Sequence, residues 1–306
     1  MSEQVEALPA QAIASDSRTT ISWRDYLELT KPRVVALMIL TSVIGMLLAA
    51  PGVPGWGVLV WGNLGIALLA GAAAVVNHVV DQKIDTVMAR TRKRPVATGK
   101  ISPVDAILFA TILACVGMAV LMWQVNHLTA WLTLASLVGY AGVYTLFLKR
   151  ATPQNITIGG LAGAMPPLLG WTAVTGQVEG HALLRVLIIV AWTPPHFWAL
   201  AIHRKEEYAK AGIPMLPVTH GNKFTELHIL LYTLMLLAVS LLPFVTGMSG
   251  GIYLVGALAL GLRFLQYAVR LLKGDDRRVA LNTFKYSITY LMALFVVLLV
   301  DHFVFF

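Results

Sequence analysis

Three polar side chains at a spacing of four residues are the chemically most informative part of the sequence. Asn77, Asp81 and Asp85 follow an apolar run, Trp56 to Val76, that is long enough to cross a bilayer. On a helix this spacing places the three in one stripe, with neighbouring Cβ atoms roughly 6 Å apart. Ionisable groups next to a membrane interior are costly, so the stripe favours a functional role.

A basic cluster follows the stripe directly and indicates an anionic ligand. Its members are Arg90, Arg92, Lys93, Arg94 and Lys100. Magnesium is usually bound by one or two carboxylates together with the phosphates of its substrate. Stripe and cluster therefore predict a site for a divalent metal and the anion that it neutralises. The alternative is an ordinary cytoplasmic loop, which explains the cations but not the carboxylates.

A second polar region extends from Trp192 to Tyr208. His196 lies within an apolar run, beside Pro194-Pro195, and His203 follows seven residues later on about the same helical face. Such an imidazole can ligate iron or take a proton. The alternative is a histidine that is hydrogen-bonded to a neighbouring helix, and both interpretations stay open here.

Two further pairs of charged residues have a functional and an ordinary interpretation. Glu206 and Glu207 are either metal ligands or solvated partners of the two cations that precede them. Lys149 and Arg150 either reach a diphosphate or extend from a helix end to the membrane surface. Thr30-Lys-Pro-Arg33, before the first apolar run, has the same ambiguity.

The elements that must position these residues are membrane helices. The chain has 306 residues, of which 58% are hydrophobic and 12% are charged. Apolar runs of about 20 residues recur along it, which is typical of an all-α polytopic membrane protein. We expect about nine spans, near 33–50, 56–78, 104–124, 128–148, 156–174, 182–202, 226–246, 250–270 and 284–304. Residues 1–22 are predicted to be a disordered cytoplasmic tail, and 23–306 a single transmembrane domain.

The distribution of charge predicts the orientation in the membrane. The formal net charge is +8, and the basic residues gather in alternate loops. The intervening loops Ala50–Gly55, Gln124–His127 and Thr246–Gly251 contain no Lys, Arg, Asp or Glu. Cytoplasmic loops carry the excess of Lys and Arg, so the N-terminus is predicted to be cytoplasmic and the C-terminus to lie outside.

The order of the elements also suggests two related halves. The stretch Arg94–Lys100 is similar to Leu216–Lys223, and each follows an even-numbered predicted span. The halves would comprise residues 23–150 and 151–306, as in parallel-repeat membrane folds. Pro166-Pro167 and Pro194-Pro195 are expected to kink or interrupt the fifth and sixth spans.

These stretches together resemble the UbiA superfamily of intramembrane prenyltransferases, and most closely its haem-farnesylating branch. The resemblance covers nearly the whole chain after the N-terminal tail. The Asn-Asp-Asp stripe indicates only the superfamily, whereas Thr193-Pro-Pro-His-Phe-Trp198 and Ala211-Gly-Ile-Pro-Met-Leu-Pro-Val218 look specific to the branch. The other matching stretches are Thr30–Arg33, Met88–Pro95, Tyr144–Asn155 and Gly159–Pro167.

The resemblance implies a nine-helix fold around a central cavity and assigns roles to the polar residues. Asp81 and Asp85 would hold magnesium on farnesyl diphosphate, with Asn77 assisting. The leaving diphosphate would be neutralised by Arg90, Arg94, Lys149 and Arg150. Haem would be contacted by Trp192, His196, His203 and Tyr208. Many relatives carry a second Asp-rich motif where this chain has His203, Glu206 and Glu207, so a second metal site there is in doubt.

The implied reaction joins the farnesyl group to a vinyl group of protohaem IX (haem b), and water completes the product, haem O. The implied setting is the inner membrane, with haem A synthase or a terminal oxidase as partner. Two alternatives stay open: a related enzyme that prenylates a quinone precursor or a chlorophyll-type acceptor, and a secondary transporter. Against the transporter, the polar residues cluster at one membrane face and not near its midplane.

Overall fold

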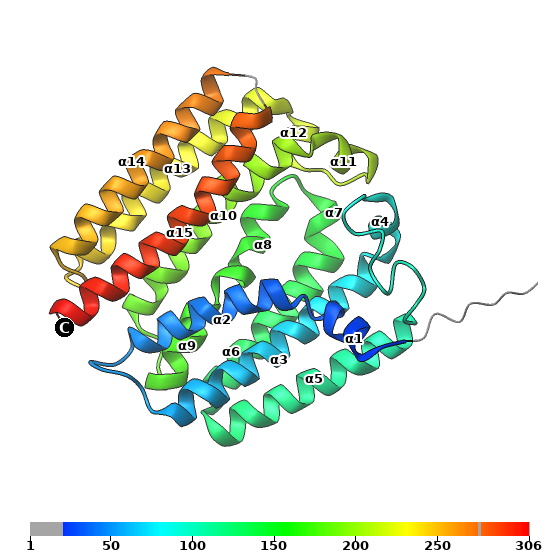
Figure 1. The fold of residues 1–306 in the computed structure, drawn as a ribbon, viewed down its shortest axis with the longest axis horizontal. Helices are drawn as coiled ribbons and strands as arrows, with labels where there is room; N and C mark the ends of the chain where they lie inside the picture. The colour runs from blue at the N-terminus through cyan, green and yellow to red at the C-terminus, as the bar shows by residue number, and fades with distance from the viewer. Residues whose placement is uncertain (1–20, 275–276, 306) are drawn as a thin grey trace, which may run out of the picture.

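The computed structural model describes residues 21–274 and 277–305, and within these ranges the chain forms helices and no strands (Figure 1). The predicted tail, residues 1–22, lies almost entirely outside the described residues. The all-α class predicted from the apolar runs is confirmed. Seven helical segments are long and apolar enough to cross a membrane: α3 (Trp56–Val80), α5 (Pro103–Gln124), α6 to α7 (His127–Ala151), α10 (Gly180–His203), α13 (Gly221–Val245), α14 (Gly251–Lys273) and α15 (Arg277–Phe305).

An eighth span is obtained if the bent pair α1 (Trp23–Leu29) and α2 (Pro32–Leu47) is counted as one. The two helices meet at an angle of 54°. The bend lies at Lys31, whose backbone is left-handed with φ 52°, and Pro32 then begins α2. Proline suits this first helical position because it lacks the N–H that would have no partner there. The bend turns α1 away from the axis of α2, toward the end of α3.

The predicted number of nine spans is not confirmed, and the difference lies in the fifth. Residues 155–175 form two helices, α8 (Asn155–Ala164) and α9 (Pro166–Thr175), separated by Met165. Each has ten residues and is therefore about 15 Å long, half of a bilayer core. The interruption predicted at Pro166-Pro167 is confirmed. The prolines Pro194 and Pro195 both lie inside α10, so they do not interrupt the sixth predicted span.

Contacts between helix ends show which ends lie together. Lys31, before α2, bonds to Asn77 near the end of α3, and Lys149 bonds to Asp81. At the other end, Asn126 donates to the carbonyl of Thr172, and the ring of His302 lies 3.0 Å from the carbonyl oxygen of Ala50. The short helices α4 (Gln82–Val87), α11 (Lys205–Lys210) and α12 (Leu216–Thr219) gather at the Lys31 end (Figure 1). The described chain thus begins and finishes at opposite ends of the bundle.

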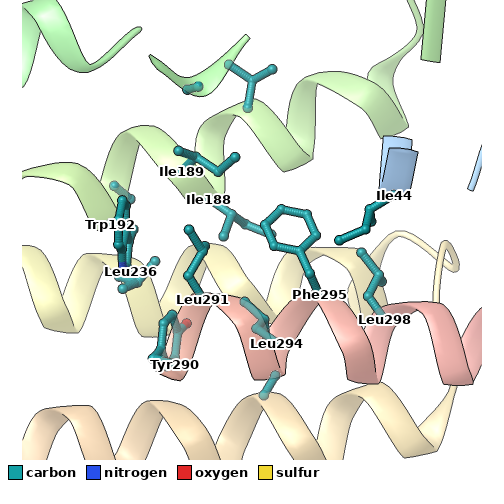
Figure 2. Packing of buried hydrophobic residues seen from close by; sticks show 14 of the residues in the cluster. Ile44, Ile188, Ile189, Trp192, Leu236, Tyr290, Leu291, Leu294, Phe295 and Leu298 are labelled. Carbon is teal, nitrogen blue, oxygen red and sulfur yellow. The ribbon is translucent and has the colours of Figure 1, made fainter. Parts of the chain in front are cut away.

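A continuous apolar core joins α2 to α10 and α15. Ile44 of α2 packs with Ile188 and Ile189 of α10, and with Phe295 and Leu298 of α15 (Figure 2). The backbones of α2 and α9 cross very closely, since a Cβ added to Gly170 would lie 2.0 Å from the carbonyl oxygen of Ser42. Small residues permit this approach. In a membrane, close packing of this kind drives helix association, because lipid tails are as apolar as the side chains and the hydrophobic effect contributes little. The core fixes the frame that holds the polar end in place.

Candidate active site

The predicted acidic stripe lies where α3 continues into α4. Asp81 is the junction between the two helices, and the N–H of Asp85 donates to its carbonyl oxygen at 2.8 Å, which continues the helical turn. Asn77, Asp81 and Asp85 are 4%, 2% and 3% exposed. The structure therefore places three polar side chains on successive turns and buries all of them. Buried charges require partners, and each has at least one.

Two lysines from distant segments converge on the first half of the stripe. The amine of Lys149 donates to Oδ2 of Asp81 at 2.5 Å, and Nδ2 of Asn77 donates to the same oxygen at 2.8 Å. The amine of Lys31 donates to Oδ1 of Asn77. The chain of contacts Lys31, Asn77, Asp81 and Lys149, called here the Asn77 network, fixes the orientation of both side chains in the stripe.

The second half of the stripe is held by the basic cluster that follows it. The guanidinium of Arg94 donates to Oδ2 of Asp85 at 2.6 Å. The hydroxyl of Thr91 donates to the backbone carbonyl of Asp85 at 3.2 Å and so ties the loop to the helix. Arg90 is exposed in the same loop. The sequence-predicted neighbours Asp85 and Arg94 are thus brought into direct contact.

A wider helical turn positions Lys149. The segment η1 (Gly139–Leu148) is a π-helix, a form that is often found at functional sites. In it, the hydroxyl of Thr145 donates to the carbonyl of Tyr140 and accepts from Nδ2 of Asn77 at 3.4 Å. Gly159 of α8 packs against the segment, since a Cβ there would lie 2.0 Å from the ring of Tyr144. Arg150, next to Lys149, reaches the carbonyl of Val80 at 3.4 Å.

The donor set of the stripe suits magnesium. Oδ1 of Asp81 is buried and has no hydrogen-bond partner, whereas Oδ2 has two. An orphaned carboxylate oxygen is costly, and a hard cation satisfies it. Among the described residues, no group of three or more His, Cys, Asp or Glu side chains could hold a metal. The residues therefore fit an ion that takes its remaining ligands from phosphate or water.

A cavity of about 610 Å³ opens beside the Asn77 network. Lys31, His78 and Arg94 line it, together with residues of α1 and the start of α2. Its other cations are Arg24, Arg33 and Arg90, and Glu28 is the one carboxylate in its wall. Trp23, Leu27, Pro32 and Val34 supply apolar surface. A cavity that is both cationic and apolar suits a ligand with an anionic head and a hydrocarbon tail.

Two predicted haem contacts within α10, Trp192 and His196, form hydrogen bonds to another helix of the protein. Nδ1 of His196 lies 2.6 Å from the hydroxyl of Ser287 on α15, and Trp192 Nε1 donates to the carbonyl of Ser287 at 2.8 Å. The rings of Trp192 and His196 stack at 4.1 Å, and Phe284 lies 4.6 Å from His196. These are the contacts expected of the interhelical alternative. The role of these two residues toward haem stays a prediction.

The polar residues after α10 are brought next to the stripe. Tyr208 is half-buried and packs in one apolar cluster with Ile84 and Met88, which flank Asp85. Glu207 is half-buried and its Oε2 atom has no partner. The loop after α3 and the loop after α10, which the sequence similarity predicts to be equivalent, are therefore in contact. Gly99 and Gly221, which the similarity of Arg94–Lys100 and Leu216–Lys223 pairs, are also both left-handed, with φ 75° and 83°.

Glu206 and His203 make ordinary surface contacts. Arg277 of α15 donates to Oε1 of Glu206 at 2.5 Å, and this hydrogen bond lowers the pKa of Glu206. Glu206 is a solvated partner of this distant arginine and not of Arg204 or Lys205, the neighbours that the sequence suggested. Nδ1 of His203 lies 3.3 Å from the carbonyl oxygen of Arg277. Their predicted metal and haem roles stay predictions.

Two residues of the site had no fixed role in the predictions from the sequence. The sequence left open whether Lys31, within Thr30-Lys-Pro-Arg33, reaches a diphosphate or extends to the membrane surface. His78 is 2% exposed, and neither of its ring nitrogens has a partner. It follows Asn77 directly, so its signal was a polar pair at the end of an apolar run. Both line the cavity.

Comparisons with known proteins show the family of this chain. The model of the UbiA prenyltransferase family matches residues 38–298. A protoheme IX farnesyltransferase of Marinobacter nauticus is 90% identical over 301 residues, covering 98% of this chain and 99% of the relative. A protein of the same name from Hahella chejuensis is 69% identical over 282 residues, covering 92% of this chain and 94% of the relative.

Solved structures share the fold at low sequence identity. A structure of digeranylgeranylglyceryl phosphate synthase superimposes with a TM-score of 0.79 at 19% identity, covering 92% of this chain and 98% of that one. A UbiA homologue from Archaeoglobus fulgidus bound to GPP and Mg²⁺ has a TM-score of 0.60 at 15% identity, covering 90% and 99%. The chain is an integral membrane protein that belongs to the UbiA prenyltransferase family.

Proposed function

We propose that this protein transfers the farnesyl group of farnesyl diphosphate to a vinyl group of haem b, with water completing haem O and diphosphate leaving. The supporting observation is the buried pair Asp81 and Asp85, each held by one cation, beside a cavity of cationic and apolar lining. The name of the relatives, which match almost the whole chain, supports the choice of haem as acceptor.

In this proposal the substrate diphosphate lies between the stripe and the basic residues. Asp81 and Asp85 would hold Mg²⁺, with the orphaned Oδ1 of Asp81 as a ligand. When bound, Mg²⁺ would withdraw charge from the diphosphate oxygens. Asn77 holds Asp81 in place, and Lys31 in turn holds Asn77. Arg90, Arg94, Lys149 and Arg150 would stabilise the negative charge that develops on the leaving oxygen.

The bond changes follow from these charges. The bond between C1 of the farnesyl group and oxygen breaks, and its electron pair leaves with the diphosphate. The terminal carbon of the vinyl group bonds to C1, which leaves a cation on the carbon next to the porphyrin ring. Water adds to that carbon and releases one proton. Water must be kept from C1 until then, and burial of the stripe serves this purpose.

The haem acceptor would approach from the side of α10 to α12. Tyr208 packs with Ile84 and Met88, which flank Asp85, and His203 is the last residue of α10, whereas Trp192 and His196 lie deeper in α10. Glu207 is a second candidate for metal or water contact, because its Oε2 atom has no partner. The product would then pass to haem A synthase or to a terminal oxidase.

We also propose that the protein lies in the inner membrane, with the Asn77 network at its cytoplasmic face. The Lys and Arg residues in the loops that follow the even-numbered predicted spans support this orientation. Farnesyl diphosphate is a charged molecule with a water-soluble head, so a site at the cytoplasmic face would receive it directly. The C-terminus would then lie on the periplasmic side.

The purified full chain, incubated with haem b, farnesyl diphosphate and Mg²⁺, tests the proposal. The expected product is heavier than haem b by one farnesyl group and one hydroxyl group, as read by mass spectrometry. A matched incubation replaces haem b with a quinone precursor such as 4-hydroxybenzoate. Prenylation of the phenol with no haem product would contradict the proposed acceptor and leave the family unchanged.

A further inference from the structure

A second polar site lies at the end of the bundle opposite the Asn77 network. Arg185, on the first turns of α10, is 1% exposed, and its Nε and Nη2 atoms have no hydrogen-bond partner. Its guanidinium lies 4.4 Å from the centre of the Trp171 ring. Arginine carries five N–H donors and stays charged, so a buried guanidinium with unpaired donors is costly.

The acidic residues at this end of the bundle leave Nε and Nη2 of Arg185 unpaired. Asp301 is fully buried, but its two oxygens accept from the backbone N–H groups of Gly250 and Tyr253, at 2.5 and 2.9 Å. Glu179 immediately precedes α10 and interacts with Arg185 electrostatically, but it accepts no hydrogen bond from Nε or Nη2 of Arg185. Ionisable residues within membrane segments are almost always paired. The missing partner is therefore an anion from outside the chain.

A cavity of about 140 Å³ lies next to the guanidinium and gives such an anion room. Arg185, Trp171 and Ser249 line it, with Leu48 and Leu298 as apolar walls. An engineered cavity of about 150 Å³ holds one benzene molecule, so this one is large enough for a single oxyanion group. A porphyrin or a farnesyl chain is much larger, which separates this site from the proposed reaction.

The position of Arg185 along α10 indicates where the anion comes from. It lies five residues after Gly180, which is about 8 Å from the start of the helix. This depth is close to the polar boundary of a bilayer, where lipid phosphates lie. We infer that Arg185 and the cavity beside it form a binding site for a phosphate oxyanion, supplied by a phospholipid head group or by free phosphate.

Thermal unfolding of the purified full chain in a neutral detergent tests this inference. The two probes are inorganic phosphate, compared with chloride at equal ionic strength, and phosphatidylglycerol, compared in mixed micelles with diacylglycerol, which has no phosphate. A saturable rise of the unfolding midpoint by about 5 °C is expected at 100 times the dissociation constant. A response to both probes or to phosphate alone assigns the site to the free oxyanion, and a response to phosphatidylglycerol alone assigns it to the lipid.

Arg185→Gln should abolish the rise. The matched control is Arg263→Gln, since Arg263 also lies over an aromatic ring, that of Tyr267 at 5.2 Å, but is exposed on α14. If Arg185→Gln does not fold, Ser249→Leu is used, because its larger side chain fills the cavity while Arg185 stays. Farnesyl transfer should remain within about twofold of wild type in all three variants. No rise in the wild type, or an equal rise in folded Arg185→Gln, would overturn the inference.

Discussion

The amine of Lys149 lies 2.5 Å from Oδ2 of Asp81, although 68 residues separate the two in the chain. Asn77 shares the same oxygen, so the other oxygen of Asp81 is the one left for a ligand. The carboxylate is thus held by protein on one side and free on the other. This asymmetry suits a side chain that must bridge a fixed cation and a metal–diphosphate complex.

Replacing either carboxylate of the stripe should stop turnover while the fold remains. Asp81→Asn and Asp85→Asn each remove a charged metal ligand but keep the shape, so we expect kcat to fall by at least about 100-fold. Steady-state assays with haem b measure the fall, and chelation of Mg²⁺ should reproduce it in the wild type. Asp105→Asn, at an exposed helix start, is the control. Near-normal activity of either variant at low Mg²⁺ would contradict the metal role.

We expect Lys31 to support turnover by holding Asn77 in place, and not only through a contact of its own with the substrate. Lys31→Gln removes the charge and loosens the Asn77 network, which should lower kcat/KM by about 10- to 100-fold. Asn77→Ala should cost a similar factor, and the double variant little more, because both changes disrupt the same contact. Additive losses in this double-mutant cycle would show that the two residues act separately.

His196→Ala should act mainly on stability. The imidazole is bonded to Ser287 and stacked on Trp192, so its removal leaves a cavity and an unpaired hydroxyl. We expect a loss of about 2–4 kcal/mol, with both substrates affected together. Ser287→Ala should give a smaller loss in the same direction. A changed haem spectrum with unchanged stability and farnesyl diphosphate affinity would instead identify His196 as a haem ligand.

The surface pair Glu206 and Arg277 should produce a small pH dependence. The hydrogen bond lowers the pKa of Glu206, so its stabilising effect is present above the usual pKa of about 4.5 and fades as the pH falls below it. Arg277→Gln should therefore narrow the stability gap between neutral and acidic pH. Thermal unfolding between pH 7 and pH 3 measures the gap, and Arg263→Gln provides a surface arginine control.

Topology reporters test the proposed orientation. Fusions at His127 and after the C-terminus should report the outer side, and a fusion at Lys100 the cytoplasm. The orientation of every later helix depends on α8 and α9, which can cross the membrane only as a pair because neither is long enough to cross alone. A cytoplasmic C-terminus would mean that this pair does not cross the membrane.

The sequence by itself determined the helical class and the acidic stripe. Apolar runs of bilayer length are sufficient to predict membrane helices, and a spacing of four residues places Asn77, Asp81 and Asp85 on one face wherever the helix lies. The basic loop after the stripe could also be assigned to the site, because it is close in sequence. These are local properties, and each depends on only a few consecutive residues.

The tertiary structure decided which distant residues complete the site. Lys31 and Lys149 reach the stripe from other segments, Ser287 contacts His196, and Nε and Nη2 of Arg185 have no hydrogen-bond partner. Such pairings depend on which helices are neighbours and how each is rotated. A membrane helix that is apolar all round carries no polar stripe to show its buried face, so periodicity cannot predict its neighbours. Close packing, as where Gly170 meets Ser42, sets those rotations and with them the site.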